Sequence, residues 1–138
     1  MNKFFKNNIQ KVIDEFLLIE SWEERYEYLI HLGKKLPKRP SDIRRNNNII
    51  IGCQSKVWLC AYIKSNKIFF HADSDAIITR GIIALLLRIY SGQFPSDIIH
   101  TNPIFISKIG FSSFLTVNRA NSMEAMFKAI KAYAIYFQ

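Results

Sequence analysis

The sequence predicts an α+β domain in which helices pack against a small, three-stranded antiparallel sheet. Helical periodicity marks both ends of the chain, and two alternating segments joined by a short turn lie near its centre. Strands that follow each other directly form hairpins, whereas a parallel sheet needs a helix between consecutive strands. A chain of 138 residues is long enough for one core, so a single domain over residues 1–138 is expected.

The first two predicted elements form a helical hairpin. Apolar residues between Phe5 and Leu17 recur at helical spacing, which indicates an amphipathic helix. The second helix opens with a capping box, in which Ser21 and Glu24 satisfy each other's backbone N–H groups, and it ends at Gly33.

The sheet is predicted from the residues that follow. From Lys56 to Ile63 apolar side chains alternate between the two faces of a strand, "KSNK" supplies a tight turn, and "IFFHAD" returns. The stretch "NIII" before Gly52 is predicted to add the third, short strand.

The central helix is expected over residues 73–92. It has a capping candidate in Asp73, Ser74 or Asp75, and it stops at Gly92. Because this segment is apolar nearly all round, it is predicted to lie at the centre of the core.

Two further helices are predicted towards the C-terminus. The segment "NPIFISKIG" has Asn102 as cap, Pro103 at the first helical position and Gly110 as stop. The last helix carries apolar side chains on one face: Met123, Met126, Phe127, Ile130 and Ala134.

The chain is basic, with a formal net charge of +8. Much of this charge lies in one proline-containing segment: Lys34, Lys35, Lys38, Arg39, Arg44 and Arg45. A charge run of this kind is usually a solvated linker, so nucleic acid is not the expected partner. The rival interpretation, a basic nucleic-acid-binding domain, predicts salt-sensitive retention on DNA or RNA.

The sequence also indicates a cytoplasmic protein with no membrane partner. Its longest apolar run, "GIIALLL", is far shorter than the roughly 20 residues that cross a bilayer. Charges at Lys11, Asp14 and Glu15 interrupt any signal-peptide core near the N-terminus.

The two cysteines are not expected to pair or to bind a metal. Cys53 and Cys60 are seven positions apart on a turn and an extended strand, about 20 Å at full extension. A disulfide needs Cα atoms about 5.5 Å apart. The histidines at 31, 71 and 100 lack the spacing of a zinc site.

The settings of the two thiols differ. Cys60 lies within an alternating strand and is expected to be a small buried apolar residue. Cys53 follows Gly52 at a loop tip, where backbone N–H groups and Lys56 would favour the reactive thiolate. These residues alone leave a reactive thiol and a structural turn cysteine equally open.

A family resemblance favours the reactive thiol. The stretch "GCQSKVWL" resembles the GCQSxVW signature of the SufE family, whose members accept sulfur from cysteine desulfurases during iron–sulfur cluster assembly. The stretches "SWEERYEYLIHLGKKLP", "DSDAIITRGIIALLLRIYSG" and "FLTVNRANSMEAM" are similar to further blocks of that family, in the same order. The resemblance implies the SufE fold, which iron–sulfur scaffold proteins of the IscU type share.

The resemblance also implies a reaction. Cys53 would take persulfide sulfur from a SufS-type cysteine desulfurase, hold it as a cysteine persulfide and pass it to a downstream iron–sulfur scaffold complex. The chain would stimulate desulfurase turnover as an accessory protein rather than a stand-alone enzyme. It would carry no cofactor or metal, since the pyridoxal phosphate belongs to the desulfurase.

Further site residues follow from the same matches. Supporting roles at the cysteine loop are implied for Gly52, Gln54, Ser55 and Arg119. Asp73 and Asp75 are expected to be helix caps first and partner contacts second. A thiol redox protein, which would form mixed disulfides without a desulfurase, is the other alternative, and a homodimer stays open.

Overall fold

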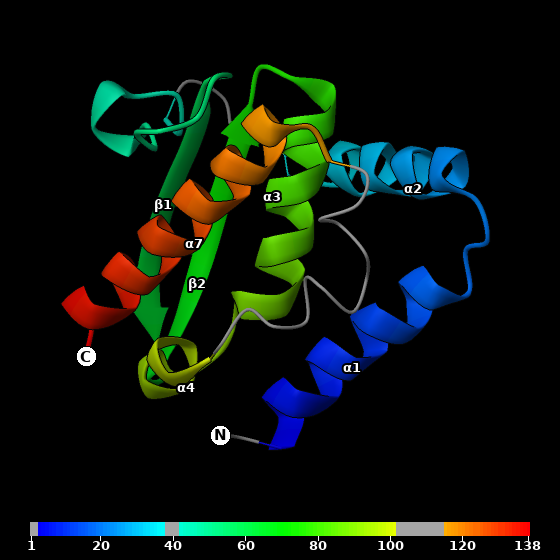
Figure 1. Ribbon diagram of the computed structural model, residues 1–138. Coiled ribbons are helices and arrows are strands. Elements are labelled where there is room, and N and C mark those ends of the chain that lie inside the picture. The colour runs from blue at the N-terminus through cyan, green and yellow to red at the C-terminus, as the bar shows by residue number, and fades with distance from the viewer. Residues whose placement is uncertain (1–2, 38–41, 102–114) are drawn as a thin grey trace.

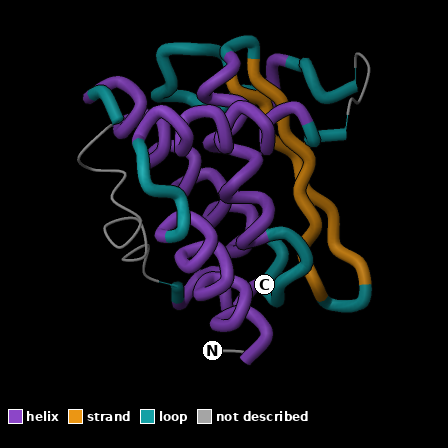
Figure 2. Tube along the Cα trace, turned by 90° about the vertical axis from the view of Figure 1, so that its right-hand side faces the viewer, coloured by secondary structure: helices purple, strands orange, loops and turns teal. Residues whose placement is uncertain are grey.

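The hairpin and its helices form two layers, with the helices on one side of the strands (Figures 1 and 2). The computed structural model describes residues 3–37, 42–101 and 115–138. The elements in these ranges are α1 (Lys3–Leu17), α2 (Trp22–Lys34), the 3-10 helix η1 (Asn46–Asn48), β1 (Val57–Lys64), β2 (Lys67–Ser74), α3 (Ile77–Tyr90), α4 (Pro95–His100) and α7 (Val117–Tyr136).

The predicted hairpin is confirmed. β1 pairs with β2 in antiparallel register, from Val57 opposite Ser74 to Lys64 opposite Lys67. The two residues between the strands, Ser65 and Asn66, have φ angles of 53° and 66°. Consecutive positive φ values produce a two-residue turn whose twist matches that of the strands.

The prediction of a third strand is wrong, because the described part of the chain holds a two-stranded sheet. Ile49 forms an isolated bridge with Trp58, and the N–H of Ile50 donates to the carbonyl of Val57 at 2.8 Å. The 3-10 turn η1 ends just before this pair, and Gly52 turns the chain just after it with a φ of 102°. Too few residues remain extended to form a strand.

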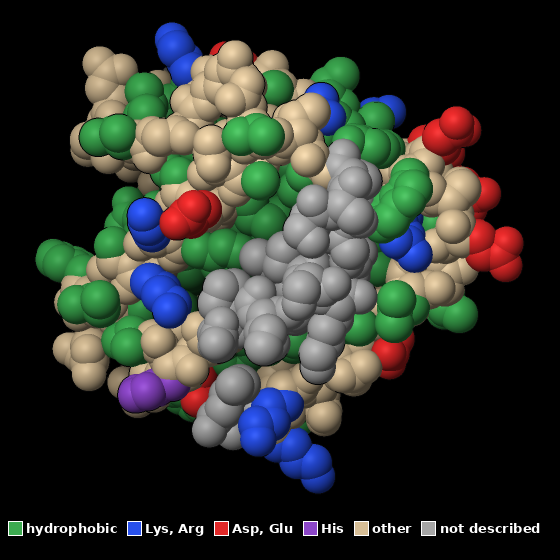
Figure 3. All heavy atoms as spheres, viewed as in Figure 1, with side chains coloured by type: hydrophobic (Ala, Val, Ile, Leu, Met, Phe, Trp, Pro, Cys, Tyr) green, Lys and Arg blue, Asp and Glu red, His purple; other side chains and the backbone are tan. Residues whose placement is uncertain are grey.

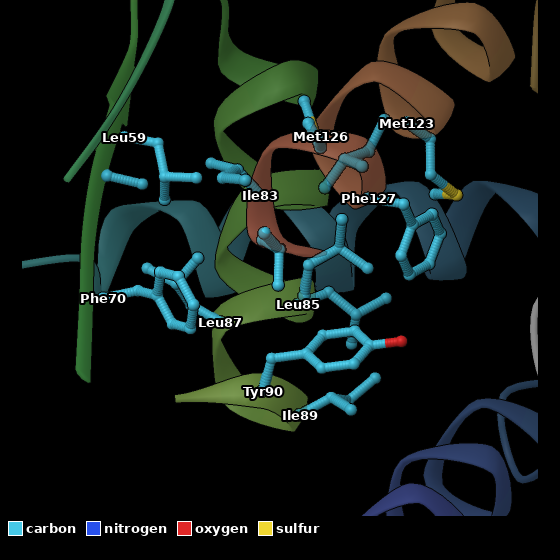
Figure 4. Packing of buried hydrophobic residues seen from close by; sticks show 14 of the residues in the cluster. Leu59, Phe70, Ile83, Leu85, Leu87, Ile89, Tyr90, Met123, Met126 and Phe127 are labelled. Atoms are coloured by element: carbon cyan, nitrogen blue, oxygen red, sulfur yellow. The ribbon is translucent and has the colours of Figure 1, made fainter. Parts of the chain in front are cut away.

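α3 lies at the centre of the core, as predicted. It contacts α1, α2, α7 and β2, and most of its side chains are buried. Figure 4 shows side chains of α3, α7 and the hairpin meeting in this core. The ring of Tyr90 packs edge-on against Phe5 and Phe127, with centroids 5.6 and 5.8 Å away. The predicted apolar face of α7 is buried along its length: Met123, Met126, Phe127, Ile130 and Ala134.

The predicted caps had mixed outcomes. The Oγ of Ser21 accepts from the N–H of Glu24 at 3.1 Å, which confirms the N-cap of α2. The cap predicted for α3 is wrong: its N-cap is Ala76, and no side chain of the described residues caps it. The hairpin register extends β2 through Ser74, so Asp73 and Ser74 belong to the end of the strand and do not cap the helix. The helix predicted over 102–110 lies outside the described residues, and α4 was not predicted.

An ion pair ties α1 to α3. The guanidinium of Arg88 makes two hydrogen bonds with the carboxylate of Glu15, at 2.5 and 2.6 Å, and Tyr28 of α2 donates to the same carboxylate. Hydrogen bonds from Arg88 are the main cause of the lowered pKa of Glu15. Three helices thereby share one polar contact at the edge of the core.

α2 and α3 cross at an unusually short distance. A Cβ atom added at Gly81 would lie 2.2 Å from the carbonyl oxygen of Leu29, and one added at Gly33 would lie 2.9 Å from the N of Gly81. Both contacts involve backbone atoms, which cannot rotate away. The absence of a side chain at Gly81 therefore sets the distance between these helices.

We expect Gly81→Ala to destabilise the fold by about 1–3 kcal/mol or more, because the new methyl group would force α2 and α3 apart. Urea unfolding followed by circular dichroism measures this effect, with Lys6→Ala on the exposed side of α1 as control. Equal unfolding free energies for Gly81→Ala and the wild type would contradict the close crossing.

Candidate functional site

The loop that carries Cys53 turns sharply at Gly52, where the φ angle is 102°. L-amino acids with a side chain rarely adopt this angle. A Cβ added at Gly52 would also lie 3.3 Å from the Cβ of Ala125 in α7. Glycine thus allows the chain both to reverse and to lie directly against α7.

The thiol of Cys53 is half-buried and packs against the edge of the core. Its Sγ donates to the backbone carbonyl of Ser122 at 3.7 Å. Burial raises the pKa of the Cys53 thiol, and a hydrogen bond with the Ser122 side chain lowers it by a smaller amount. The net pKa is raised, so the prediction that loop N–H groups and Lys56 favour the thiolate is wrong for the isolated protein.

Hydrogen bonds fix the loop at its C-terminal end. The N–H of Lys56 donates to Oδ1 of Asp75 at 3.1 Å, and the Oγ of Ser74 donates to the carbonyl of Lys56 at 2.8 Å. The N–H of Asp75 donates to the same carbonyl at 3.2 Å. The side chain of Asp75 therefore anchors the cysteine loop instead of capping α3.

A groove of about 480 Å³ lies beside this loop. The loop and the first turns of α3 and α7 line it, and both helices begin at the end of the molecule where β1 starts (Figure 1). The groove gathers the predicted residues Gln54, Ser55 and Arg119. Ser122, which contacts the thiol of Cys53, lines the same groove.

Arg119 lies at the rim of the groove. Its guanidinium donates to the hydroxyl of Tyr26 at 3.4 Å and lies 5.7 Å from the centre of that ring. Its backbone N–H donates to Oγ1 of the N-cap residue Thr116. The arginine thus lines the groove and contacts both α7 and α2.

Asp73 is engaged in ion pairs. Its Oδ2 lies 2.9 Å from Nε of Arg44, and its Oδ1 lies 3.1 Å from Nε of Arg80. The guanidinium of Arg44 also lies 4.6 Å from the centre of the Trp58 ring. Arg44 is 45% exposed, as expected for the basic segment, but it also makes these specific contacts, and residues 38–41 lie outside the described part.

Cys60 is separate from this site. It is paired with His71 across the hairpin and is half-buried rather than buried. Neither cysteine forms a disulfide in the described structure. The described residues hold no group of three His, Cys, Asp or Glu side chains that could bind a metal ion, and none of their helices is long and apolar enough to cross a membrane.

The charges on the face drawn in Figure 3 are mixed. Lysine and arginine side chains are scattered among apolar and acidic ones on this face, and acidic side chains gather at the edge where α2 lies. Glu23 and Glu24 in the first turn of α2 are exposed. This face does not present the continuous basic surface that phosphate backbones favour.

Comparison with known families assigns the chain. Residues 10–134 match the SufE family, described as an Fe–S metabolism associated domain. The chain belongs to the SufE family. It is 37% identical over 132 residues to an uncharacterised SufE-like protein of Rhizobium meliloti strain 1021, covering 92% of this chain and 94% of the relative. A SufE-like protein of Rhizobium etli is 36% identical over 137 residues, covering 96% and 93%.

A solved structure supports the fold of this SufE protein. The solution structure of a hypothetical protein from Thermus thermophilus superposes with a TM-score of 0.78, at 19% identity and 94% coverage of both chains. The fold resemblance predicted from the SufE motifs is therefore consistent with a known structure. Family membership indicates a role in iron–sulfur metabolism.

Sequence reasoning missed two residues of the site. Ser122 lies in the matched block "FLTVNRANSMEAM", but its contact with Cys53 joins positions 69 residues apart. Arg44 lies in the basic segment, and nothing in the sequence distinguishes it from the other basic residues or indicates its contacts with Asp73 and Trp58. A polar residue within the otherwise apolar buried face of α7 was the one available signal for Ser122.

The raised pKa of Cys53 predicts slow alkylation at neutral pH. Iodoacetamide rates, resolved by peptide mass spectrometry, should rise with pH with a midpoint above about 8.5, the ordinary thiol value. Because folding favours the neutral thiol, its stabilising contribution is present at neutral pH and is lost as pH rises through the raised pKa. A midpoint below about 8 would contradict the burial account.

Ser122→Ala removes the hydrogen bond that lowers the Cys53 pKa. We expect the alkylation midpoint to move further up and the rate at fixed pH to fall roughly threefold, the size of one weak hydrogen bond. Asn118→Ala, at an exposed residue of the same groove, is the control. A Ser122→Ala rate equal to that of the control would contradict the role of Ser122.

Proposed function

We propose that this SufE protein accepts sulfur on Cys53 from a SufS-type cysteine desulfurase, stimulates the turnover of that enzyme and passes the sulfur on for iron–sulfur cluster assembly. The observation that carries the proposal is the half-buried thiol of Cys53 at a glycine turn, in a stretch that resembles the SufE signature, beside an open groove. The reaction suits a reducing compartment such as the cytoplasm, where thiols persist.

The transfer is an exchange at sulfur. The Cys53 thiol loses its proton, and the thiolate attacks the terminal sulfur of the persulfide on the desulfurase. A new S–S bond forms to Cys53 while the old S–S bond breaks, and the desulfurase cysteine leaves as a thiolate that takes up a proton. No oxidant is needed, because the terminal sulfur keeps its oxidation state.

The surroundings of Cys53 suit both the free thiol before transfer and the persulfide after it. Burial favours the protonated thiol before transfer, and it limits access of small thiols to a persulfide afterwards. The Ser122 hydroxyl offers a hydrogen bond to the anionic form. Activation is therefore assigned to the complex with the desulfurase, which supplies the pyridoxal phosphate chemistry that releases sulfur from L-cysteine.

Exposed apolar side chains near the loop support a protein partner. Ile51, directly before Gly52, is 91% exposed, and Ile77 and Val117 begin the two helices at the groove. Apolar groups left in water beside a reactive group are typical of a surface that a partner covers. The desulfurase is the proposed partner at this surface, and the iron–sulfur scaffold complex is the proposed recipient.

The proposal predicts that Cys53→Ser removes desulfurase stimulation. Alanine release from L-cysteine by a SufS-type desulfurase of the same source should fall to the rate of the desulfurase alone, since serine cannot accept sulfur. Cys60→Ser, in the middle of β1 opposite His71, should keep most of the stimulation. Equal stimulation by wild type and Cys53→Ser would overturn the proposal.

A further inference from the structure

Arg44 makes two contacts that the neighbouring Arg45 does not share, and it follows a buried residue. Its Nε lies 2.9 Å from Oδ2 of Asp73, its guanidinium stacks 4.6 Å from the centre of the Trp58 ring, and the adjacent Ile43 is buried. A planar guanidinium can pair with a carboxylate and stack on an aromatic ring at once, which lysine cannot do equally well. Arg44 thus holds the C-terminal end of the basic segment against the hairpin.

The segment held in this way leads directly into the cysteine loop. After Arg44 the chain forms the turn of η1, and the N–H of Ile50 then donates to the carbonyl of Val57. Gly52 and Cys53 follow. Arg44 and Ile50 therefore secure the N-terminal side of the loop to the start of β1.

Asp73 joins the two sides of the loop. It receives Arg44 from the N-terminal side, while its neighbours Ser74 and Asp75 hold Lys56 on the C-terminal side. Arg80 of α3 fixes the other oxygen of the Asp73 carboxylate. Both ends of the loop are thus tied to one segment between β2 and α3.

We propose that Arg44 is a positioning residue for Cys53: by binding Asp73 and Trp58 it keeps the loop closed and the thiol half-buried. The assignment rests on the proposed sulfur-acceptor function for its biological meaning. It sets how much of the thiol is available before a partner docks. The residue acts through the loop and touches no reacting atom.

The neighbouring Arg45 provides a matched control. It has the same charge and side chain, but its guanidinium lies 3.8 Å from Asp42 and both side chains are largely exposed, at 65% and 71%. The Arg44–Asp73 pair is less exposed, at 45% and 22%, and the Trp58 contact adds to it, whereas a pair as exposed as that of Arg45 contributes little to structure. A change of net charge alone would affect Arg44→Ala and Arg45→Ala equally.

The test is the pH profile of iodoacetamide alkylation at Cys53, resolved by peptide mass spectrometry, for wild type, Arg44→Ala, Arg44→Lys and Arg45→Ala. Losing one ion pair and one cation–π contact should raise the Arg44→Ala rate at neutral pH roughly 3- to 10-fold. The midpoint should move down towards the ordinary thiol value. Arg45→Ala should match the wild type, and Arg44→Lys should lie between them.

Equal rates for Arg44→Ala and Arg45→Ala would overturn the assignment. Circular dichroism and urea unfolding show whether each variant is folded. If Arg44→Ala is unfolded, Arg44→Lys is the test variant. An alkylation pH profile for Arg44→Lys equal to that of the wild type would then overturn the proposal. Sodium chloride at about 1 M should speed alkylation of the wild type more than that of Arg44→Ala, because salt screens the exposed ion pair.

The test separates this assignment from the proposed function. Alkylation needs no desulfurase, so its outcome stands whether or not Cys53 accepts sulfur. If the wild type takes up no sulfur while Arg44→Ala still exposes Cys53, the proposed function fails and the positioning role holds. If sulfur transfer occurs and the alkylation profiles are equal, the positioning role fails alone.

Discussion

The backbone contact between α2 and α3 at Gly81 is the constraint on which the rest of this structure depends. Gly81 has no methyl group, which would lie 2.2 Å from the carbonyl oxygen of Leu29, so the two helices can approach closely enough to bury most side chains of α3. The hairpin packs on another side of α3, and α7 crosses it. The position of α3 in turn places its first residue, Ile77, at the groove beside the cysteine loop. The geometry of the site therefore depends on how the core packs.

The site combines protection with restrained reactivity. Burial raises the pKa of Cys53, and the loop is tied at both ends to the segment between β2 and α3. A thiol held in this way reacts slowly with random oxidants and electrophiles. For a sulfur acceptor this is an advantage, since transfer is then confined to a complex in which the desulfurase presents its persulfide. The same burial disfavours the thiolate form of Cys53 in the isolated chain, because it raises the pKa of the thiol.

Sequence alone predicted the features that depend on local patterns. The alternation from Lys56 to Ile63 predicted the hairpin, and the spacing of Met123, Met126, Phe127, Ile130 and Ala134 predicted the buried face of α7. The third strand and the caps of α3 failed because tertiary contacts decided them: η1 shortens the extended segment before Gly52, and Asp73 and Asp75 bind the loop and the basic segment instead. Cys53, Gly52 and the groove residues Gln54, Ser55 and Arg119 were proposed as site residues from family motifs. Ser122 and Arg44 were not, because their roles arise from contacts between distant parts of the chain.

The central claim is that Cys53 itself receives the sulfur atom. The most direct measurement is peptide-resolved mass spectrometry after a single turnover of the chain with a SufS-type desulfurase and L-cysteine, followed by alkylation of all thiols and persulfides. The account predicts that the peptide carrying Cys53 gains the mass of one sulfur atom and that the peptide carrying Cys60 does not. An unmodified Cys53 peptide in the presence of an active desulfurase, or sulfur found on Cys60 instead, would contradict it.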